Sequence, residues 1–242
     1  MVVKHLALEE LLAKAESGAT EPYLCRLSDG QLYYVKGRSA TARGLIAEAL
    51  CGGLGREFEL PVPEFAFVEI TPRMTAHDPQ ARHSLGSGTA FASLKRDSIY
   101  PVTASSLDLV PLQMQRRLFV FDYWIRNEDR TATEHGGNPN LFLSGPNYEP
   151  LVIDHNLAFD PAFSLENNRL YHVCREAWRT AQGDLLLPAQ MRDMMVDLAS
   201  RIDRAAMALP EEWLEMAPNA AEEMVAWLRA CDTDEFWEAL NG

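Results

Sequence analysis

The sequence has few cysteines, no long apolar run and a shortage of basic residues. Its 242 residues include four cysteines, none in a Cys-x-x-Cys pair, which argues against a zinc site or a disulfide framework and favours buried free thiols. No apolar stretch reaches the roughly 18 residues of a membrane span, and acidic residues interrupt the N-terminal segment where a signal peptide would be apolar. These absences predict a cytoplasmic protein without stable membrane association.

The charge balance is strongly acidic. The chain has 22 Lys and Arg against 35 Asp and Glu, a formal net charge of −13. Such a chain repels polyanions, so nucleic acid is not an expected partner. The hydrophobic fraction of 47% is that of a globular protein, and the length suffices for two lobes around one cleft.

Helix and strand patterns alternate in the first 96 residues. The predicted elements are a helix over 6–15, a hairpin of strands 23–27 and 32–36, a helix over 40–54 and a strand over 64–70. Ser28-Asp29-Gly30 supplies the hairpin turn, and the glycines at 52, 53 and 55 are expected to end the second helix. Residues 71–89 have no periodicity and predict an exposed loop.

From residue 97 onward the pattern is mainly helical. Helices are predicted over about 106–127, 188–208 and 220–240, and Asn219 with Glu222 three residues later is typical of an N-cap with its capping box. We therefore expect an α+β fold, with a small mixed α/β lobe over 1–96 and a larger, mainly helical lobe over 97–242.

A second hairpin carries polar side chains at its ends. Residues 141–143 and 151–153 are strand-like and flank a turn at 144–147. Because the start of one antiparallel strand lies beside the end of the other, Asn140 and Asp154 should be neighbours. Amide and carboxylate oxygens suit Mg²⁺. The sequence therefore predicts a magnesium site at this end of the hairpin.

Other polar residues suit phosphoryl transfer. Asp129, at the end of the preceding helix, would accept or orient the proton of an attacking hydroxyl. Lys36 ends a strand rich in Tyr and Val and is the candidate cation from the opposite lobe. Glu48, on the following helix, is its candidate ion-pair partner.

The loop before the first strand of the first hairpin is a candidate phosphate-binding loop. Ser17, Gly18 and Thr20 would offer hydroxyl and backbone N–H groups to phosphate oxygens.

Each candidate also has a purely structural interpretation. Asp154 can open a turn, and Asp129 can sit in a surface ion pair. Lys36 can extend to solvent from an edge strand, and Glu48 can lie on the exposed face of its helix. The order of Asp129, Asn140 and Asp154 around one hairpin favours the functional interpretation.

A set of short motifs resembles the HipA-like kinase domains over about residues 17–160. The motifs are Tyr34-Val35-Lys36-Gly37, Ala47-Glu48-Ala49, Leu60-Pro61-Val62-Pro63-Glu64, Asn127-Glu128-Asp129-Arg130, Asn138-Pro139-Asn140-Leu141 and Ile153-Asp154-His155-Asn156-Leu157-Ala158-Phe159. The last three are also similar to type II phosphatidylinositol 4-kinases.

The resemblance implies a protein-kinase-like fold, ATP as the phosphoryl donor and a divalent metal. By motif position it makes Asp129 the catalytic aspartate, Asn140 and Asp154 the metal ligands, and Lys36 the phosphate-binding lysine. The spacer between Asp129 and Asn140 is longer than in those families, which leaves Asn138 as the alternative ligand; the hairpin argument favours Asn140.

Together these observations predict an ATP-dependent kinase that uses Mg²⁺ to transfer the γ-phosphoryl group to a hydroxyl. A protein acceptor is favoured over a lipid, because the chain is acidic and has no membrane-binding helix; a small-molecule hydroxyl stays open. The alternatives are a nucleotide-binding module without turnover that acts by binding a partner, and a toxin-type protein that a partner suppresses.

Overall fold

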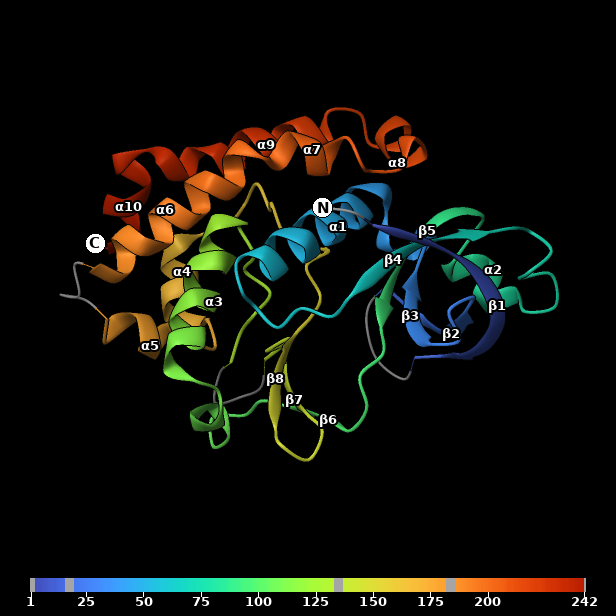
Figure 1. The fold of residues 1–242 in the computed structure, drawn as a ribbon, viewed down its shortest axis with the longest axis horizontal. Helices are drawn as coiled ribbons and strands as arrows, with labels where there is room; N and C mark the ends of the chain where they lie inside the picture. The colour runs from blue at the N-terminus through green and yellow to red at the C-terminus, as the bar shows by residue number, and fades with distance from the viewer. Residues whose placement is uncertain (1–2, 16–19, 133–136, 182–185, 242) are drawn as a thin grey trace.

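Five strands at the start of the chain close into a barrel, and most of the helices gather to one side of it (Figure 1). This computed structural model describes residues 3–15, 20–132, 137–181 and 186–241. The barrel strands are β1 (Lys4–Lys14), β2 (Tyr23–Leu27), β3 (Leu32–Lys36), β4 (Phe65–Ile70) and β5 (Gly88–Leu94). They run in the order β1-β2-β3-β5-β4 around the barrel.

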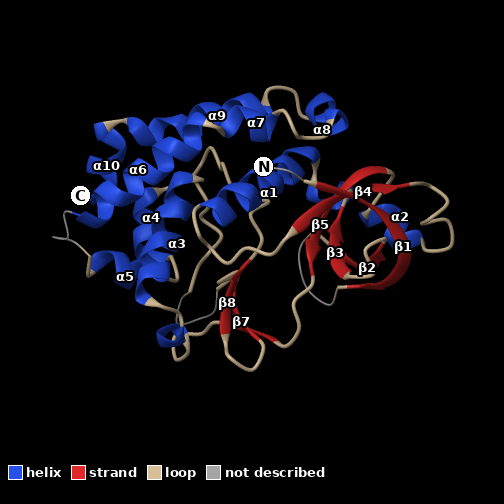
Figure 2. Cartoon of the chain, viewed as in Figure 1, coloured by secondary structure: helices blue, strands red, loops and turns tan. Residues whose placement is uncertain are grey.

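The described helices lie mostly in the second part of the chain, and Figure 2 shows most of them gathered to one side of the barrel strands. They are α1 (Ala42–Glu57), α2 (Pro79–Ser84), α3 (Leu112–Trp124), α4 (Leu165–Tyr171), α5 (Arg175–Arg179), α6 (Leu186–Ser200), α7 (Ile202–Ala206), α8 (Glu211–Met216), α9 (Ala220–Arg229) and α10 (Asp234–Asn241). Three short 3₁₀ helices lie at Arg38–Ala40, Leu107–Leu109 and Ala230–Asp232. The expected α+β architecture is confirmed, whereas the lobe boundary at residue 96 stays a prediction.

The predicted helix over 6–15 is wrong, because this segment forms most of β1. It pairs antiparallel with β2, with Leu8 opposite Leu27, and parallel with β4, with Lys4 opposite Ala66. The pairing of β1 with β2 shifts register twice, between Leu8 and Glu10 and between Leu11 and Ala13. The hydrogen bonds to two neighbouring strands outweigh the helix propensity of a segment rich in Leu, Ala, Glu and Lys.

The first predicted hairpin is confirmed with its bounds. Strands β2 and β3 pair from Tyr23 opposite Val35 to Arg26 opposite Leu32. In the turn, Gly30 has a φ of 77°, a conformation that glycine adopts without strain. Inside the barrel the side chains of these strands join a core cluster of their own, separate from that of the helical part.

Helix α1 continues through the glycines that were expected to end it. A Cβ at Gly52 would lie 3.2 Å from the Phe65 ring, and one at Gly55 would lie 3.0 Å from Val62 Cγ2. The glycines therefore allow other segments to pack closely against the helix. Although α1 follows β3 in the chain, its buried side chains belong to the core of the helical part, where it packs against α8 and α9.

The segment 71–89 is more ordered than predicted, and the C-terminal helices are shorter. Residues 79–84 form α2, which Asp78 caps by accepting a hydrogen bond from Ala81 N at 2.9 Å, and β5 begins at Gly88. The helices expected over 188–208 and 220–240 are each divided in two, and that over 106–127 begins only at Leu112. Asn219 adopts a φ of 67° and its side chain makes no capping hydrogen bond, so the predicted capping box is wrong.

The second predicted hairpin is confirmed as part of a three-stranded sheet. Strands β6 (Ile99–Pro101), β7 (Leu141–Ser144) and β8 (Glu149–Val152) pair antiparallel, with Leu141 opposite Val152. In the view of Figure 1 this sheet lies below α1, between the barrel and the helices.

Helix α8 ties the helical part to the barrel. Glu212 Oε2 accepts a hydrogen bond from Thr89 N at 2.8 Å, and Trp213 Nε1 donates one to Thr89 O at 2.8 Å. The Trp213 ring also meets Phe67 edge to face at 5.1 Å. A side chain at position 88 would collide with Glu212, so Gly88 makes this contact possible.

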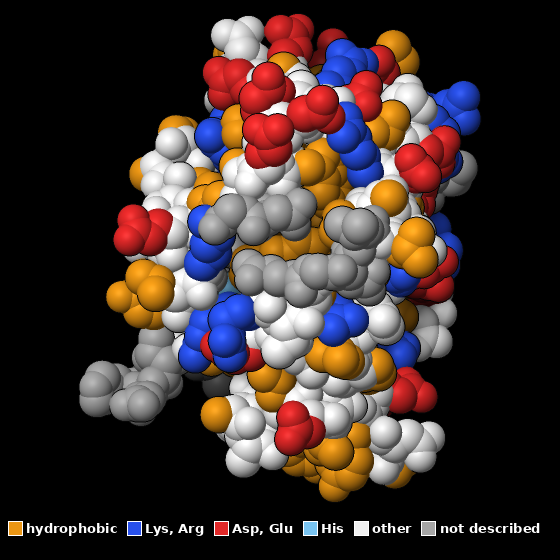
Figure 3. Space-filling model, turned by 90° about the vertical axis from the view of Figure 1, so that its left-hand side faces the viewer, with side chains coloured by type: hydrophobic (Ala, Val, Ile, Leu, Met, Phe, Trp, Pro, Cys, Tyr) orange, Lys and Arg blue, Asp and Glu red, His pale blue; other side chains and the backbone are white. Residues whose placement is uncertain are grey.

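Acidic side chains gather near the top of the molecular face shown in Figure 3, at the level of the C-terminal helices. The first turns of two of these helices are acidic, with Glu222 and Glu223 in α9 and Asp234 and Glu235 in α10, where negative charge favours the helix dipole. None of the helices in the described ranges has the length and apolar character needed to cross a membrane.

Candidate active site

Lys36, at the end of β3, lies where the barrel meets α1 and the second hairpin. Its side chain is buried, and Nζ lies 3.3 Å from Glu48 Oε1 and 2.7 Å from Asp154 Oδ1. The structure therefore brings together three residues that the sequence had predicted for one site. Glu48 faces the protein interior, which excludes its interpretation as a solvent-exposed helix residue.

The second carboxylate oxygen of Glu48 holds the backbone beyond Asp154. Glu48 Oε2 accepts a hydrogen bond from His155 N at 2.8 Å. One buried side chain on α1 thus contacts both the lysine of the barrel and the segment that carries Asp154. Any shift of α1 would disturb both contacts.

The charges of Lys36 and Asp154 stabilise each other. Burial alone would lower the pKa of Lys36, but the carboxylates of Glu48 and Asp154 raise it above its ordinary value. Burial would raise the pKa of Asp154, but the charge of Lys36 and its hydrogen bond lower it. Lys36 is therefore a cation and Asp154 an anion at neutral pH. The pKa of Glu48 is raised, mainly because the side chain is buried.

Asp129 lies on the loop after α3, facing the start of β7. Its Oδ2 accepts hydrogen bonds from Asn138 Nδ2 at 2.7 Å and from Asn140 Nδ2 at 3.0 Å. Partial burial, with the nearby charge of Asp154, raises the pKa of Asp129 despite these hydrogen bonds. A carboxylate with a raised pKa is a better proton acceptor.

Asn140 and Asp154 flank the open end of the hairpin, as the sequence predicts. Asn140 O accepts a hydrogen bond from Ile153 N at 3.1 Å, which places the residue before Asp154 directly beside Asn140. Both flanking residues have left-handed backbones, with φ values of 41° for Asn140 and 63° for Asp154. Such conformations are strained for residues other than glycine and concentrate at functional sites.

The oxygen atoms at this end of the hairpin fit a hard divalent cation. Within the described ranges, no donor is hydrogen-bonded to Asn140 Oδ1 or Asp154 Oδ2, so both oxygens are free to act as ligands. The same ranges contain no group of three or more His, Cys, Asp or Glu side chains suited to a metal. An amide oxygen and a carboxylate oxygen suit an ion such as Mg²⁺, because this ion takes one or two protein oxygens and completes its shell with water and phosphate.

A buried polar cluster beneath the loop was missed by sequence reasoning. Arg130 and Asp122 are fully buried, and Arg130 Nε donates a hydrogen bond to Asp122 Oδ2 at 2.6 Å. His172 Nε2 lies 2.9 Å from the same oxygen, and Asn127 Nδ2 donates to Asp122 Oδ1 at 2.8 Å. The available signal was the carboxylate of Asp122 within the apolar run of α3.

The predicted phosphate-binding loop falls mostly outside the described residues. Ser17 and Gly18 are not among them, and Thr20 is buried just before β2. Its role in nucleotide binding therefore stays a prediction.

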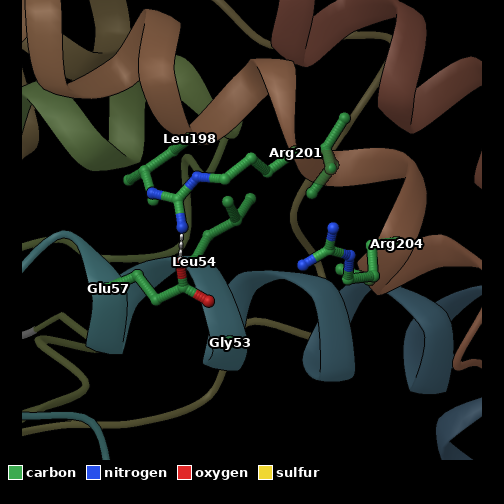
Figure 4. Close-up of a pocket in the computed structure, with 8 residues that line it drawn as sticks. Gly53, Leu54, Glu57, Leu198, Arg201 and Arg204 are labelled. Carbon is green, nitrogen blue, oxygen red and sulfur yellow. Dashed lines mark hydrogen bonds and ion pairs between the residues drawn. The ribbon is translucent and has the colours of Figure 1, made fainter. Parts of the chain in front are cut away.

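A small cavity lies on the far side of α1 (Figure 4). Its volume is about 40 Å³, enough for only one or two water molecules. Gly53, Leu54 and Glu57 line it from α1, and Arg201 of the α6–α7 junction closes it with a 3.3 Å ion pair to Glu57. None of the residues predicted for the active site lines this cavity.

Solved kinases share the fold at low sequence identity. The proinflammatory kinase CtkA of Helicobacter pylori superposes with a TM-score of 0.58 and 10% identity, covering 99% of this chain and 97% of that chain. A Golgi casein kinase gives a TM-score of 0.54 with 11% identity, over 98% of this chain and 72% of that chain. The Golgi casein kinase with Mn/ADP bound gives 0.52 with 10% identity, over 99% and 73%.

These structures confirm the protein-kinase-like fold, with a barrel lobe and a helical lobe. No curated protein sequence matches the chain. The sequence matches the family of HipA-like kinases over residues 8–240, nearly its whole length. The chain therefore belongs to the HipA-like kinase family.

Proposed function

We propose that the protein transfers the γ-phosphoryl group of ATP to a hydroxyl group in the presence of Mg²⁺. The observation that carries this proposal is the buried contact of Lys36 with Glu48 and Asp154. It presents a cation from the barrel beside a carboxylate at the metal-binding end of the hairpin. Phosphoryl transfer requires that combination, because charge on the phosphates must be neutralised from several sides.

Each residue then has a separate role. Lys36 binds the phosphate oxygens, and Asn140 and Asp154 supply the protein oxygens for the cation. Asp129 accepts the proton of the attacking hydroxyl, helped by its raised pKa. When bound, Mg²⁺ neutralises charge on the phosphates. Asn138 donates a hydrogen bond to Asp129, and we assign it to orienting that carboxylate.

A protein hydroxyl is the favoured acceptor. The Golgi casein kinase, which has the same fold, is named for a protein substrate, and one of its structures contains Mn and ADP. The net charge of −13 acts against docking on anionic membranes.

Thermal unfolding with and without ligands tests nucleotide binding. A ligand at about 100 times its Kd stabilises the folded state by about 2.7 kcal/mol, a shift of several degrees in Tm. We expect that shift with ATP and Mg²⁺ together, a smaller one with ATP alone, and its loss in Asp154→Asn. Asp108→Asn, which alters an exposed carboxylate, should behave as the wild type.

Transfer from γ-labelled ATP then tests turnover and the acceptor class. The acceptors are dephosphorylated casein, phosphatidylinositol vesicles and glycerol, and label on casein alone is expected. Label on the vesicles would instead identify a lipid kinase. Binding without transfer to any acceptor or to water would support the module without turnover, and no binding at millimolar ATP and Mg²⁺ would refute the proposal.

A further inference from the structure

Arg130 connects the two strands of the second hairpin at its open end, although its side chain is closed to solvent. Its Nη1 donates a hydrogen bond to Asn140 O at 2.5 Å and another to Ile153 O at 3.3 Å. Asn140 is itself a proposed cation ligand, and Ile153 directly precedes the other ligand, Asp154. A single guanidinium nitrogen thus contacts the backbone at both points from which the ligand side chains project.

The same residue also fixes the loop of the proposed base. Arg130 directly follows Asp129 and is anchored at Nε by Asp122 on α3. Because Asp122 lies within a helix, its hydrogen bond fixes the orientation of the Arg130 guanidinium plane relative to α3. The backbone of Asp129, the start of β7 and the end of β8 are therefore all held relative to α3.

Asp122 is held as an anion by its surroundings. Burial would raise its pKa, but the charge of Arg130 and the hydrogen bond of His172 hold it well below its ordinary value. His172 Nδ1 accepts a hydrogen bond from Cys174 N at 3.0 Å, so its Nε2 carries the proton donated to Asp122. The carboxylate thus receives hydrogen bonds from three side chains, which leave it little freedom to move.

Stability alone is a poor explanation for this arrangement. Replacing a buried ion pair with apolar side chains of similar volume is often neutral or stabilising. The specific feature of Arg130 is instead the direction of Nη1 toward the carbonyl groups of Asn140 and Ile153, with that of Pro139 at 3.4 Å. Lysine cannot reproduce it, because an ammonium group is a point charge on a flexible stem without the planar fork of arginine.

We propose that Arg130 is a positioning residue that sets the spacing of Asn140 and Asp154 and thereby the affinity of the cation site. This inference rests on the proposed function. Arg130 has no exposed surface, so it acts through these residues and does not touch the nucleotide. Partners that orient metal ligands typically affect metal affinity by 10- to 100-fold.

The test compares Arg130→Lys with Arg116→Lys. Arg116 lies on α3 and also donates to a backbone carbonyl, Ala177 O at 3.2 Å, but that carbonyl belongs to α5. Mn²⁺ affinity is measured by electron paramagnetic resonance in the presence of ADP, and ADP affinity is measured without metal. Both are measured well below the Tm of each variant.

We expect Arg130→Lys to bind Mn²⁺ 10- to 100-fold more weakly than the wild type, with ADP affinity in the absence of metal within twofold. Arg116→Lys should match the wild type in both measurements. A wild type that binds neither Mn²⁺ nor ADP would overturn the proposed function, and this inference with it. A folded Arg130→Lys with wild-type Mn²⁺ affinity, or with equal losses for Mn²⁺ and ADP, would overturn the inference alone.

If Arg130→Lys does not fold, Asp122→Asn is the variant that tests the proposal. This variant keeps the shape of the anchor and removes its charge, so Mn²⁺ affinity should again fall by at least tenfold with ADP affinity retained. Wild-type Mn²⁺ affinity in Asp122→Asn, or failure of both variants to fold, would show that the cluster serves stability and would reject the positioning role.

Discussion

The barrel and the helical lobe bury separate cores, and the candidate site lies where the two meet. The barrel core contains residues from its own strands and from α2, including Val35 and Ile70. The larger core unites the C-terminal helices with α1, including Leu50, and extends to Phe67 and Phe91 of the barrel. Helix α1 therefore follows the barrel in sequence but belongs to the other lobe in packing.

The candidate site therefore depends on the relative orientation of the two lobes. Lys36 comes from the barrel, whereas Glu48 and Asp154 come from elements attached to the larger core. A small rotation of the barrel against α1 would separate the lysine from both carboxylates. The hydrogen bonds of α8 to Thr89 oppose such a rotation from the outer side of the barrel.

The largest expected effect comes from removing the proposed base in the helical lobe. Asp129→Asn should lower turnover by about 100- to 10,000-fold, the usual contribution of general acid–base catalysis. Binding of ADP and Mn²⁺ should persist, because Lys36 and Asp154 are unchanged. Phosphoryl transfer from labelled ATP measures the loss, with Asp108→Asn as the control. Turnover within threefold of the wild type would reject the role of Asp129.

The second prediction breaks the contact between the lobes. Lys36→Met should reduce the free energy of unfolding by about 3–5 kcal/mol, because it leaves the carboxylates of Glu48 and Asp154 without their cation. The double variant Lys36→Met/Glu48→Gln should recover much of that stability in urea unfolding but none of the activity. Lys95→Met removes a surface ion pair and should have only a small effect on stability. Recovery of activity in the double variant would contradict the assignment of Lys36 to phosphate binding.

The third prediction tests to which lobe α1 belongs. Leu50→Ala and Ile70→Ala each remove a fully buried side chain and should each cost about 2–5 kcal/mol in stability. The two variants should then show faster amide hydrogen exchange in different parts of the molecule. Leu50→Ala should accelerate exchange in α8 and α9, whereas Ile70→Ala should do so in the barrel strands. The opposite result for Leu50→Ala, with faster exchange in the barrel and an unchanged helical lobe, would place α1 with the barrel.

The smallest predicted effect is a pH dependence at the junction. Burial lowers the pKa of His155 to about 3. Between that value and the ordinary histidine pKa, the unfolded chain binds a proton that the folded chain does not, so stability falls as the pH falls. From pH 7 to pH 5 this loss is about 2 kcal/mol.

His155→Gln should lack this part of the pH dependence. Urea unfolding of the wild type and the variant at both pH values gives the difference. His77→Gln, on the surface of the barrel lobe, should follow the wild type. Identical pH dependence in all three proteins would show that His155 is not buried as a neutral side chain.

Local sequence patterns predicted the parts of the fold that local interactions build. Both hairpins were identified because a turn signal joins two strand-like runs, and their partners lie close in sequence. The closeness of Asn140 and Asp154 was predicted for the same reason, since both flank the open end of one hairpin. Pairing of β1 with β4 was hidden, because it joins segments about 60 residues apart.

The buried polar cluster around Asp122 could not be predicted for a related reason. Only the carboxylate of Asp122 within an apolar run stands out in the local sequence. The packing of α3 against α5 and the loop that carries Asp129 unites it with Arg130 and His172. Likewise, the glycines of α1 are typical of a helix end in the sequence, whereas in the fold they allow Phe65 and Val62 to pack against the helix.

The sequence by itself determined which residues carry charge, where the two hairpins turn, and the order of Lys36, Asp129, Asn140 and Asp154 along the chain. Tertiary structure alone decided that residues 4–14 form a strand, that α1 joins the helical core, and that Arg130 contacts both strands at the open end of the second hairpin. The physical reason is range: turns and strand alternation depend on neighbouring residues, whereas strand partners and buried ion pairs depend on segments that only folding brings together.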